Sequence, residues 1–122
     1  MEHRAKTVLV VDDDAAIRRL EMAILTREGY AVFEAGDGAD AIERLGRGDL
    51  DLLLLDLRMP MTDGWTVMET VAAMRRPPRV VIVTGWADAP PDHLRPFVDA
   101  TLAKPFQPAD LIKTCNRLRP VH

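Results

Sequence analysis

Short apolar runs alternate along the whole chain with segments whose apolar residues recur at helical spacing. The runs are four or five residues long and bounded by polar residues, as in buried strands, and the clearest is Leu52–Leu55. In the segment 15–28, by contrast, Ile17, Leu20 and Ile24 lie three or four positions apart. The alternation predicts strands at about 7–11, 31–35, 51–55, 80–84 and 101–103. It predicts helices at about 15–28, 37–46, 65–74, 92–97 and 108–117.

Glycine and proline mark the ends of several of these elements. Gly29 suits the C-terminal cap of the first helix, and Pro108 suits the first turn of the last one. The helix near 92–97 is the weakest prediction, because three prolines bracket it, at positions 90, 91 and 96.

Five strand-then-helix units predict one α/β domain over residues 1–122. Parallel strands need helix-length, right-handed crossovers, so both faces of the sheet should be covered by helices. We therefore expect a flavodoxin-like (βα)5 three-layer sandwich with a parallel five-stranded sheet in the order 2-1-3-4-5.

Composition narrows the class of protein. The chain has 122 residues, 48% of them hydrophobic and 29% charged, as in an ordinary globular protein. Its net charge is −3 with scattered basic residues, which does not favour binding to nucleic acid. The first apolar run is too short for a signal peptide or a membrane span, and the lone Cys115 fits a reducing cytoplasm.

Polar residues follow four of the predicted strands directly. Asp12 and Asp13 follow the first, Asp56 the third, Thr84 ends the fourth, and Lys104 follows the fifth. Ligands of open parallel sheets bind at the carboxyl ends of strands. Three clustered carboxylates repel one another, and the usual partner for such a cluster is a hard divalent cation such as Mg²⁺.

Each of these residues also has a purely structural interpretation. Asp12 and Asp13 could cap the first helix, as Asp14 is expected to do, and Asp56 could be a turn residue. Thr84 alone would be an ordinary strand residue and Lys104 an ordinary surface lysine. Their joint occurrence at successive strand ends favours the functional interpretation.

This set of residues resembles the receiver domain of two-component response regulators, over nearly the whole chain. The resemblance implies that a sensor histidine kinase or phosphotransfer protein transfers a phosphoryl group to Asp56, and that a conformational change follows. It implies that Asp12, Asp13, Asp56 and the backbone carbonyl of Arg58 hold Mg²⁺, for which Mn²⁺ can substitute. It also implies no turnover of an external substrate.

The same resemblance assigns the remaining site residues. Thr84, the Gly85 amide and Lys104 would bind the phosphoryl group, and the Lys104–Pro105 peptide bond would be cis. Arg58 and Trp86 would flank the path of the hydrolytic water, which predicts a long-lived phosphoryl group.

Three other functions fit the sequence less well. The segment Gly36–Ala41 fits G-x-G-x-x-A, but it follows the second strand, and its aspartates would repel a pyrophosphate. A phosphatase of the haloacid dehalogenase type would need an acid where Arg58 stands. A receiver-like module that binds without phosphorylation is disfavoured because all five of the receiver's key polar residues are present.

The chain departs from the family at its output face. Receivers usually carry Tyr or Phe at the switch position, and here it is Thr101. The interval from Thr84 to Lys104 is also about two residues shorter than usual, within the weak fourth helix. The alternative function is therefore a phosphate shuttle or sink, or an atypical interaction module, either standing alone or belonging to a longer regulator.

Overall fold

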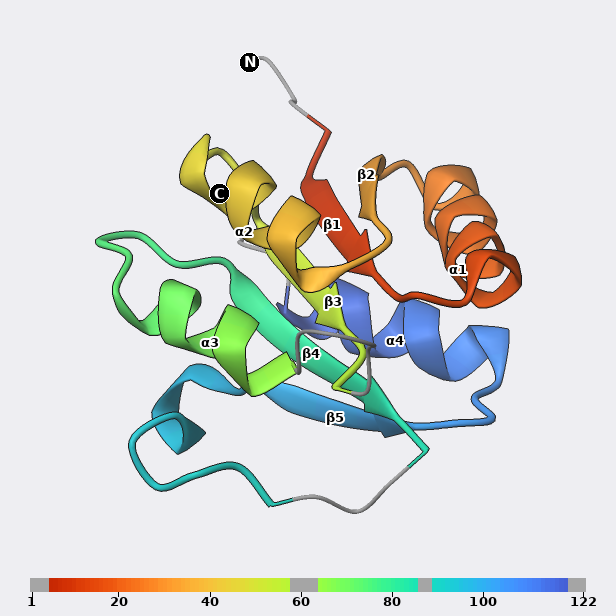
Figure 1. Ribbon diagram of the computed structural model, residues 1–122. Coiled ribbons are helices and arrows are strands. Elements are labelled where there is room, and N and C mark those ends of the chain that lie inside the picture. Colours follow the sequence, from red (N-terminus) through yellow and green to blue (C-terminus); the bar gives the residue numbers. More distant parts are fainter. Residues whose placement is uncertain (1–4, 58–63, 86–88, 119–122) are drawn as a thin grey trace.

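The computed structural model describes residues 5–57, 64–85 and 89–118, and its strands form one parallel sheet (Figure 1). The sheet order is β2-β1-β3-β4-β5, and every neighbouring pair is parallel. The strands are β1 (Thr7–Val11), β2 (Ala31–Ala35), β3 (Leu52–Leu55), β4 (Arg79–Thr84) and β5 (Ala100–Ala103). The predicted flavodoxin-like order is confirmed.

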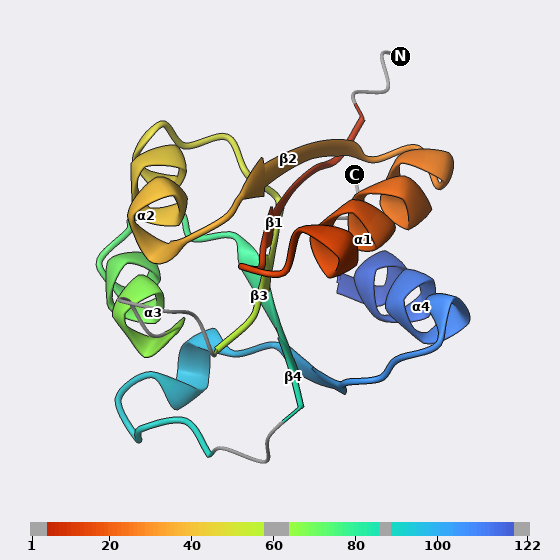
Figure 2. The ribbon, with the colours of Figure 1, turned by 45° about the vertical axis from the view of Figure 1, so that its right-hand side comes forward.

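Helices cover both faces of the sheet. They are α1 (Ala15–Arg27), α2 (Gly38–Gly46), α3 (Gly64–Ala72) and α4 (Pro108–Leu118). Viewed along the sheet, α1 and α4 lie on one side and α2 and α3 on the other (Figure 2). The three-layer sandwich is therefore confirmed. Within the described residues, no helix has the length and apolar character needed to cross a bilayer.

The run of four leucines in β3 supplies both layers of the core. Successive side chains of a strand point to opposite faces. Leu53 and Leu55 accordingly belong to the cluster beneath α2 and α3, whereas Leu52 and Leu54 belong to the cluster beneath α1 and α4. All four are buried. A central strand with helices on both sides has no polar face, which explains the unbroken apolar run.

The helix ends follow the sequence signals. The Asp14 carboxylate accepts hydrogen bonds from the backbone N–H groups of Ala16 and Ile17 at 2.9 and 3.2 Å, so Asp14 is the N-cap of α1, as expected. Gly29, with φ of 92°, follows the C-terminal end of α1 in the left-handed region that favours glycine.

The segment between β4 and β5 forms no α-helix in its described residues, 89–99. It contains only a 3₁₀ turn, η1 (Arg95–Phe97). The Arg95 N–H donates to the Pro91 carbonyl oxygen at 3.0 Å, but Pro96 has no N–H with which to continue this pattern. Leu94 is buried in the core and anchors the segment. The prolines thus reduce the weak fourth helix to one turn.

Gly64 allows α3 to begin directly against the backbone that follows β3. Its N–H donates to the Leu57 carbonyl oxygen at 2.9 Å. A Cβ atom at this position would lie 2.7 Å from the Leu57 Cα, so only glycine fits without a shift. This contact places the start of α3 beside the residue that follows Asp56.

Candidate phosphorylation and metal site

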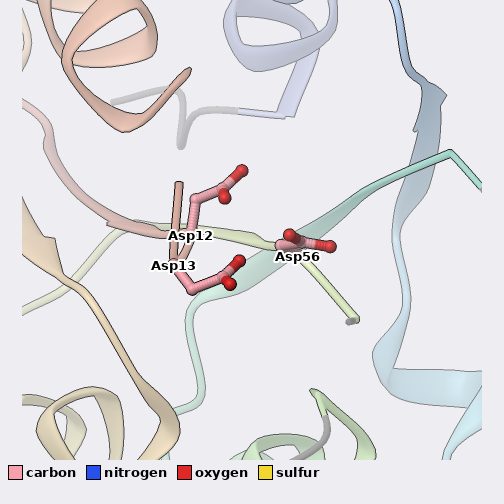
Figure 3. Close-up of side chains that lie close together, drawn as sticks. All are labelled: Asp12, Asp13 and Asp56. Carbon is pink, nitrogen blue, oxygen red and sulfur yellow. The ribbon is translucent and has the colours of Figure 1, made fainter. Parts of the chain in front are cut away.

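Three carboxylates meet at the carboxyl ends of β1 and β3. Because these strands are neighbours in the sheet, Asp12 and Asp13 at the end of β1 lie beside Asp56 at the end of β3 (Figure 3). The Asp56 N–H donates to the Val11 carbonyl oxygen at 3.0 Å and continues the ladder. One oxygen from each carboxylate lies within 4.8 Å of the others. The predicted acidic cluster is confirmed.

Asp12 is the most deeply buried acid of the cluster, and hydrogen bonds fix it on several sides. Its carboxylate accepts from the Asp14 N–H at 2.9 Å and from Lys104 Nζ at 2.8 Å. Its carbonyl oxygen accepts from Arg18 Nη1 at 2.7 Å, and Arg18 Nε in turn donates to Glu34 at 2.7 Å. Asp12 is completely buried, whereas Asp13 is exposed. The two adjacent acids therefore have different environments.

Lys104 joins the end of β5 to the acidic cluster. Its N–H donates to the Thr84 carbonyl oxygen at 2.9 Å, and its Nζ lies 2.8 Å from Asp12 Oδ2 and 3.2 Å from Asp56 Oδ2. Burial acts to lower the pKa of this ammonium, but the hydrogen bonds and charges of Asp12 and Asp56 outweigh it and raise the pKa. Lys104 therefore stays charged. The peptide bond from Lys104 to Pro105 is cis, as expected.

The other site residues predicted from the sequence are divided among the same edge of the sheet, the interior of β5 and the part of the chain outside the described residues. Thr84 is buried at the end of β4, opposite Ala103 of β5 in the register, and the exposed Gly85 follows it. Thr101 is exposed on β5. Arg58 and Trp86 lie outside the described residues, so their expected roles remain predictions.

The donor set of the cluster fits a hard divalent cation. Carboxylate oxygens are the ligands that Mg²⁺ prefers, and it needs only one or two of them beside water. Among the described residues, Lys104 is the one cation that forms ion pairs with Asp12 and Asp56. Within the same residues, Asp13 forms no ion pair. The cluster thus keeps excess negative charge, which a divalent cation would offset.

The glycine-rich segment leads into a helix whose N-terminus is capped by the chain itself. Gly36 and Asp37 connect β2, an edge strand, to α2, whose first residue is Gly38. The Asp37 carboxylate caps α2 by accepting from the Asp40 N–H at 2.8 Å. The helix N-terminus is therefore already occupied by an acid of this chain, which disfavours the binding of a pyrophosphate there.

The structure places one further carboxyl near the site that the sequence analysis did not single out. Glu21 of α1 is buried, and its Oε2 has no hydrogen-bond partner. Burial first, and the charge of Asp12 next, raise the pKa of Glu21 to about 8. Its spacing was a usable signal, because Glu21 lies four residues after Ile17 and four before Leu25, on the apolar side of the predicted helix.

Comparison with known proteins agrees with this geometry. Residues 8–116 match the model of the response regulator receiver domain family. The chain is 37% identical over 108 residues to the transcriptional regulatory protein ResD of Bacillus subtilis, which covers 86% of this chain but only 44% of ResD. It is 31% identical over 115 residues to the receiver protein CpdR of Brucella abortus, which covers 93% of this chain and 96% of CpdR.

A solved structure shows the same arrangement of elements. The response regulator TrrA of Thermotoga maritima, in complex with Mg²⁺ and BeF, superposes with a TM-score of 0.83 at 28% identity, covering 93% of this chain and 98% of TrrA. Fold, acidic cluster and family match thus agree, and the chain belongs to the response regulator receiver domain family.

Proposed function

We propose that Asp56 is the phospho-acceptor of this receiver domain. The donor would be a phosphohistidine of a sensor histidine kinase or phosphotransfer protein. In the transfer, the phosphorus–nitrogen bond of the donor breaks, a bond forms between phosphorus and an Asp56 carboxylate oxygen, and the imidazole leaves. The observation that carries the proposal is the Lys104 ammonium, bonded to both Asp12 and Asp56 beside a cluster of three carboxylates.

Each neighbouring residue then has a distinct role. Asp12, Asp13, Asp56 and the Arg58 carbonyl would hold Mg²⁺ or Mn²⁺, and the bound cation supplies positive charge that offsets the charge of the phosphoryl oxygens. Lys104 would supply a second positive charge. The Thr84 hydroxyl and the Gly85 amide would donate hydrogen bonds to the transferred group.

The proposal extends to the output of the domain. Phosphorylation would change its conformation and so its affinity for a downstream protein, without turnover of an external substrate and without direct binding to nucleic acid. Relatives that are transcriptional regulatory proteins, and one named a sporulation initiation phosphotransferase, support a role in two-component signalling. The expected cytoplasmic location stays a prediction.

The test is labelling with a small phosphodonor. The protein is incubated with acetyl phosphate or phosphoramidate in the presence of Mg²⁺, and its intact mass is measured with and without a chelator. We expect the mass to increase by one phosphoryl group per chain. This labelling should be absent when a chelator is present and absent in Asp56→Ala. The matched control is Asp92→Ala, since Asp92 is an exposed acid that forms an ion pair with Arg95, and its removal should not affect labelling.

Two outcomes would contradict the proposal. One is full labelling of Asp56→Ala, which would place the phosphoryl group elsewhere. The other is undiminished labelling in excess chelator, which would remove the divalent cation from the reaction.

A further inference from the structure

Glu21 is an anomaly in the core of this domain. Buried carboxyl groups are normally hydrogen-bonded, because an unpaired polar group is poorly solvated by the protein interior. Among the described residues, its Oε2 is the one buried side-chain oxygen or nitrogen without a hydrogen-bond partner. A core leucine at this position would pack without that cost, so the carboxyl is not explained by stability.

The groups around Glu21 belong to the phosphorylation site. The charges of Asp12 on β1, Asp56 on β3 and Lys104 after β5 all act on its carboxyl. Glu21 acts in turn on the Cys115 thiol of α4, which is completely buried. Among the described residues, Lys104 is the one cation whose charge acts on Glu21. The unpartnered Glu21 oxygen thus shares its surroundings with an N–H donor, Lys104, which already has two carboxylate partners.

Within the part of the chain that the structure describes, the Lys104 ammonium leaves one N–H donor unused, and a depression lies beside it. An ammonium has three N–H donors, and the contacts described for Lys104 use two of them. Beside the lysine is a depression of about 330 Å³ lined by Ile17 and Leu20 of α1 and by Lys104, Pro105 and Phe106. Ile17 lies one helical turn before Glu21, so the depression borders the turn of α1 that precedes Glu21, although Glu21 itself does not line it.

Lys104 now bonds the same carboxylates that a divalent cation would need. Cation and ammonium would compete for oxygens of Asp12 and Asp56, and like charges close together repel. The ammonium would need another acceptor once those oxygens are engaged. We propose that Glu21 is a positioning residue for Lys104, which accepts its ammonium when a divalent cation occupies the acidic cluster. This inference rests on the proposed metal site.

The proposal is tested by Mg²⁺ affinity, measured by NMR titration of the amides next to the cluster. The variants are Glu21→Leu, which cannot accept a hydrogen bond, and Glu21→Gln, which can. Glu21→Leu removes the charge-assisted hydrogen bond that the Lys104 ammonium would donate to Glu21. We therefore expect Mg²⁺ to bind about tenfold more weakly to this variant. Glu21→Gln should recover part of the loss, and the exposed control Glu28→Gln should bind as the wild type does.

A double-mutant cycle separates this mechanism from its alternatives. In a Lys104→Met background, Glu21→Leu should change the Mg²⁺ affinity less than twofold, because no ammonium remains to be positioned. An equal loss in both backgrounds would overturn the proposal, since Glu21 would then act on the metal or on packing alone. Unchanged affinity of Glu21→Leu would also overturn it. Failure of the wild type to bind Mg²⁺ would instead refute the proposed function.

A second measurement applies if Lys104→Met does not fold. The ammonium signal of Lys104 is followed by ¹⁵N NMR while Mg²⁺ is added. We expect the signal to stay protected from exchange with water in the wild type and to lose that protection in Glu21→Leu. Identical behaviour of the two proteins would overturn the proposal.

Discussion

The buried Glu21 carboxyl should make the stability of the metal-free protein depend on pH near neutrality. Its pKa is about 8 in the folded state, against an ordinary value of 4.5 that the unfolded chain restores. Between these two values the folded protein holds a proton that the unfolded chain releases. The stabilising contribution of this proton is therefore complete below pH 4.5 and is lost as the pH rises through 8.

The size of the effect follows from the two pKa values. They are separated by 3.5 pH units (8 − 4.5). This separation corresponds to a contribution of at most about 5 kcal/mol to the free energy of unfolding. Within that interval the free energy of unfolding should fall by about 1.4 kcal/mol for each pH unit. A rise from pH 5.5 to 7.5 should thus remove roughly 2–3 kcal/mol, a large part of the usual stability of a small domain.

Urea unfolding in EDTA at pH 5.5, 6.5 and 7.5 measures this dependence. The wild type is compared with Glu21→Gln, which cannot ionise, and with Glu43→Gln as an exposed control. The three histidines are common to all three proteins, so their titration cancels in the differences. Glu21→Gln should gain stability over the wild type as the pH rises, whereas Glu43→Gln should run parallel to it. A pH-independent difference between wild type and Glu21→Gln would refute the reasoning.

Three further results are expected. Gly64→Ala should lower the free energy of unfolding in urea by about 1–3 kcal/mol, because the added Cβ would meet the Leu57 backbone. Gly46→Ala, whose Cβ would point into open space, should not lower it, and equal effects of the two substitutions would contradict the close contact at Gly64. Asp13→Ala should abolish Mg²⁺ binding in an NMR titration. It should also raise the melting temperature of the metal-free protein, because it removes one of three clustered like charges, and a lower melting temperature would contradict this account of repulsion. A Mg²⁺–beryllofluoride complex should shift the amide resonances of residues 89–97, where a single 3₁₀ turn holds the backbone; shifts confined to the loops around the aspartates would favour a phosphate shuttle.

Local patterns in the sequence determined the elements and the residues at their ends. The apolar run at 52–55 and the helical spacing after Ala15 each depend on neighbours only a few residues away. Strand-to-helix alternation then limited the fold to a parallel sheet covered on both faces, and the structure confirms this arrangement. Because a parallel sheet brings the carboxyl ends of its strands to one edge, the meeting of Asp12, Asp13 and Asp56 could also be predicted.

Other features were decided only by tertiary packing. Lys104 bonds Asp12 and Asp56, each of which lies more than 40 residues before it in the sequence. The choice of carboxylate oxygens therefore depends on the placement of β5 and of the loop that follows it. Glu21 is buried on α1, which packs with α4 on the same face of the sheet, and no local pattern specifies the surroundings of that side chain. Periodicity shows which face of a helix turns inward, but the solvation and charge of a buried group depend on contacts that form only when distant elements pack together.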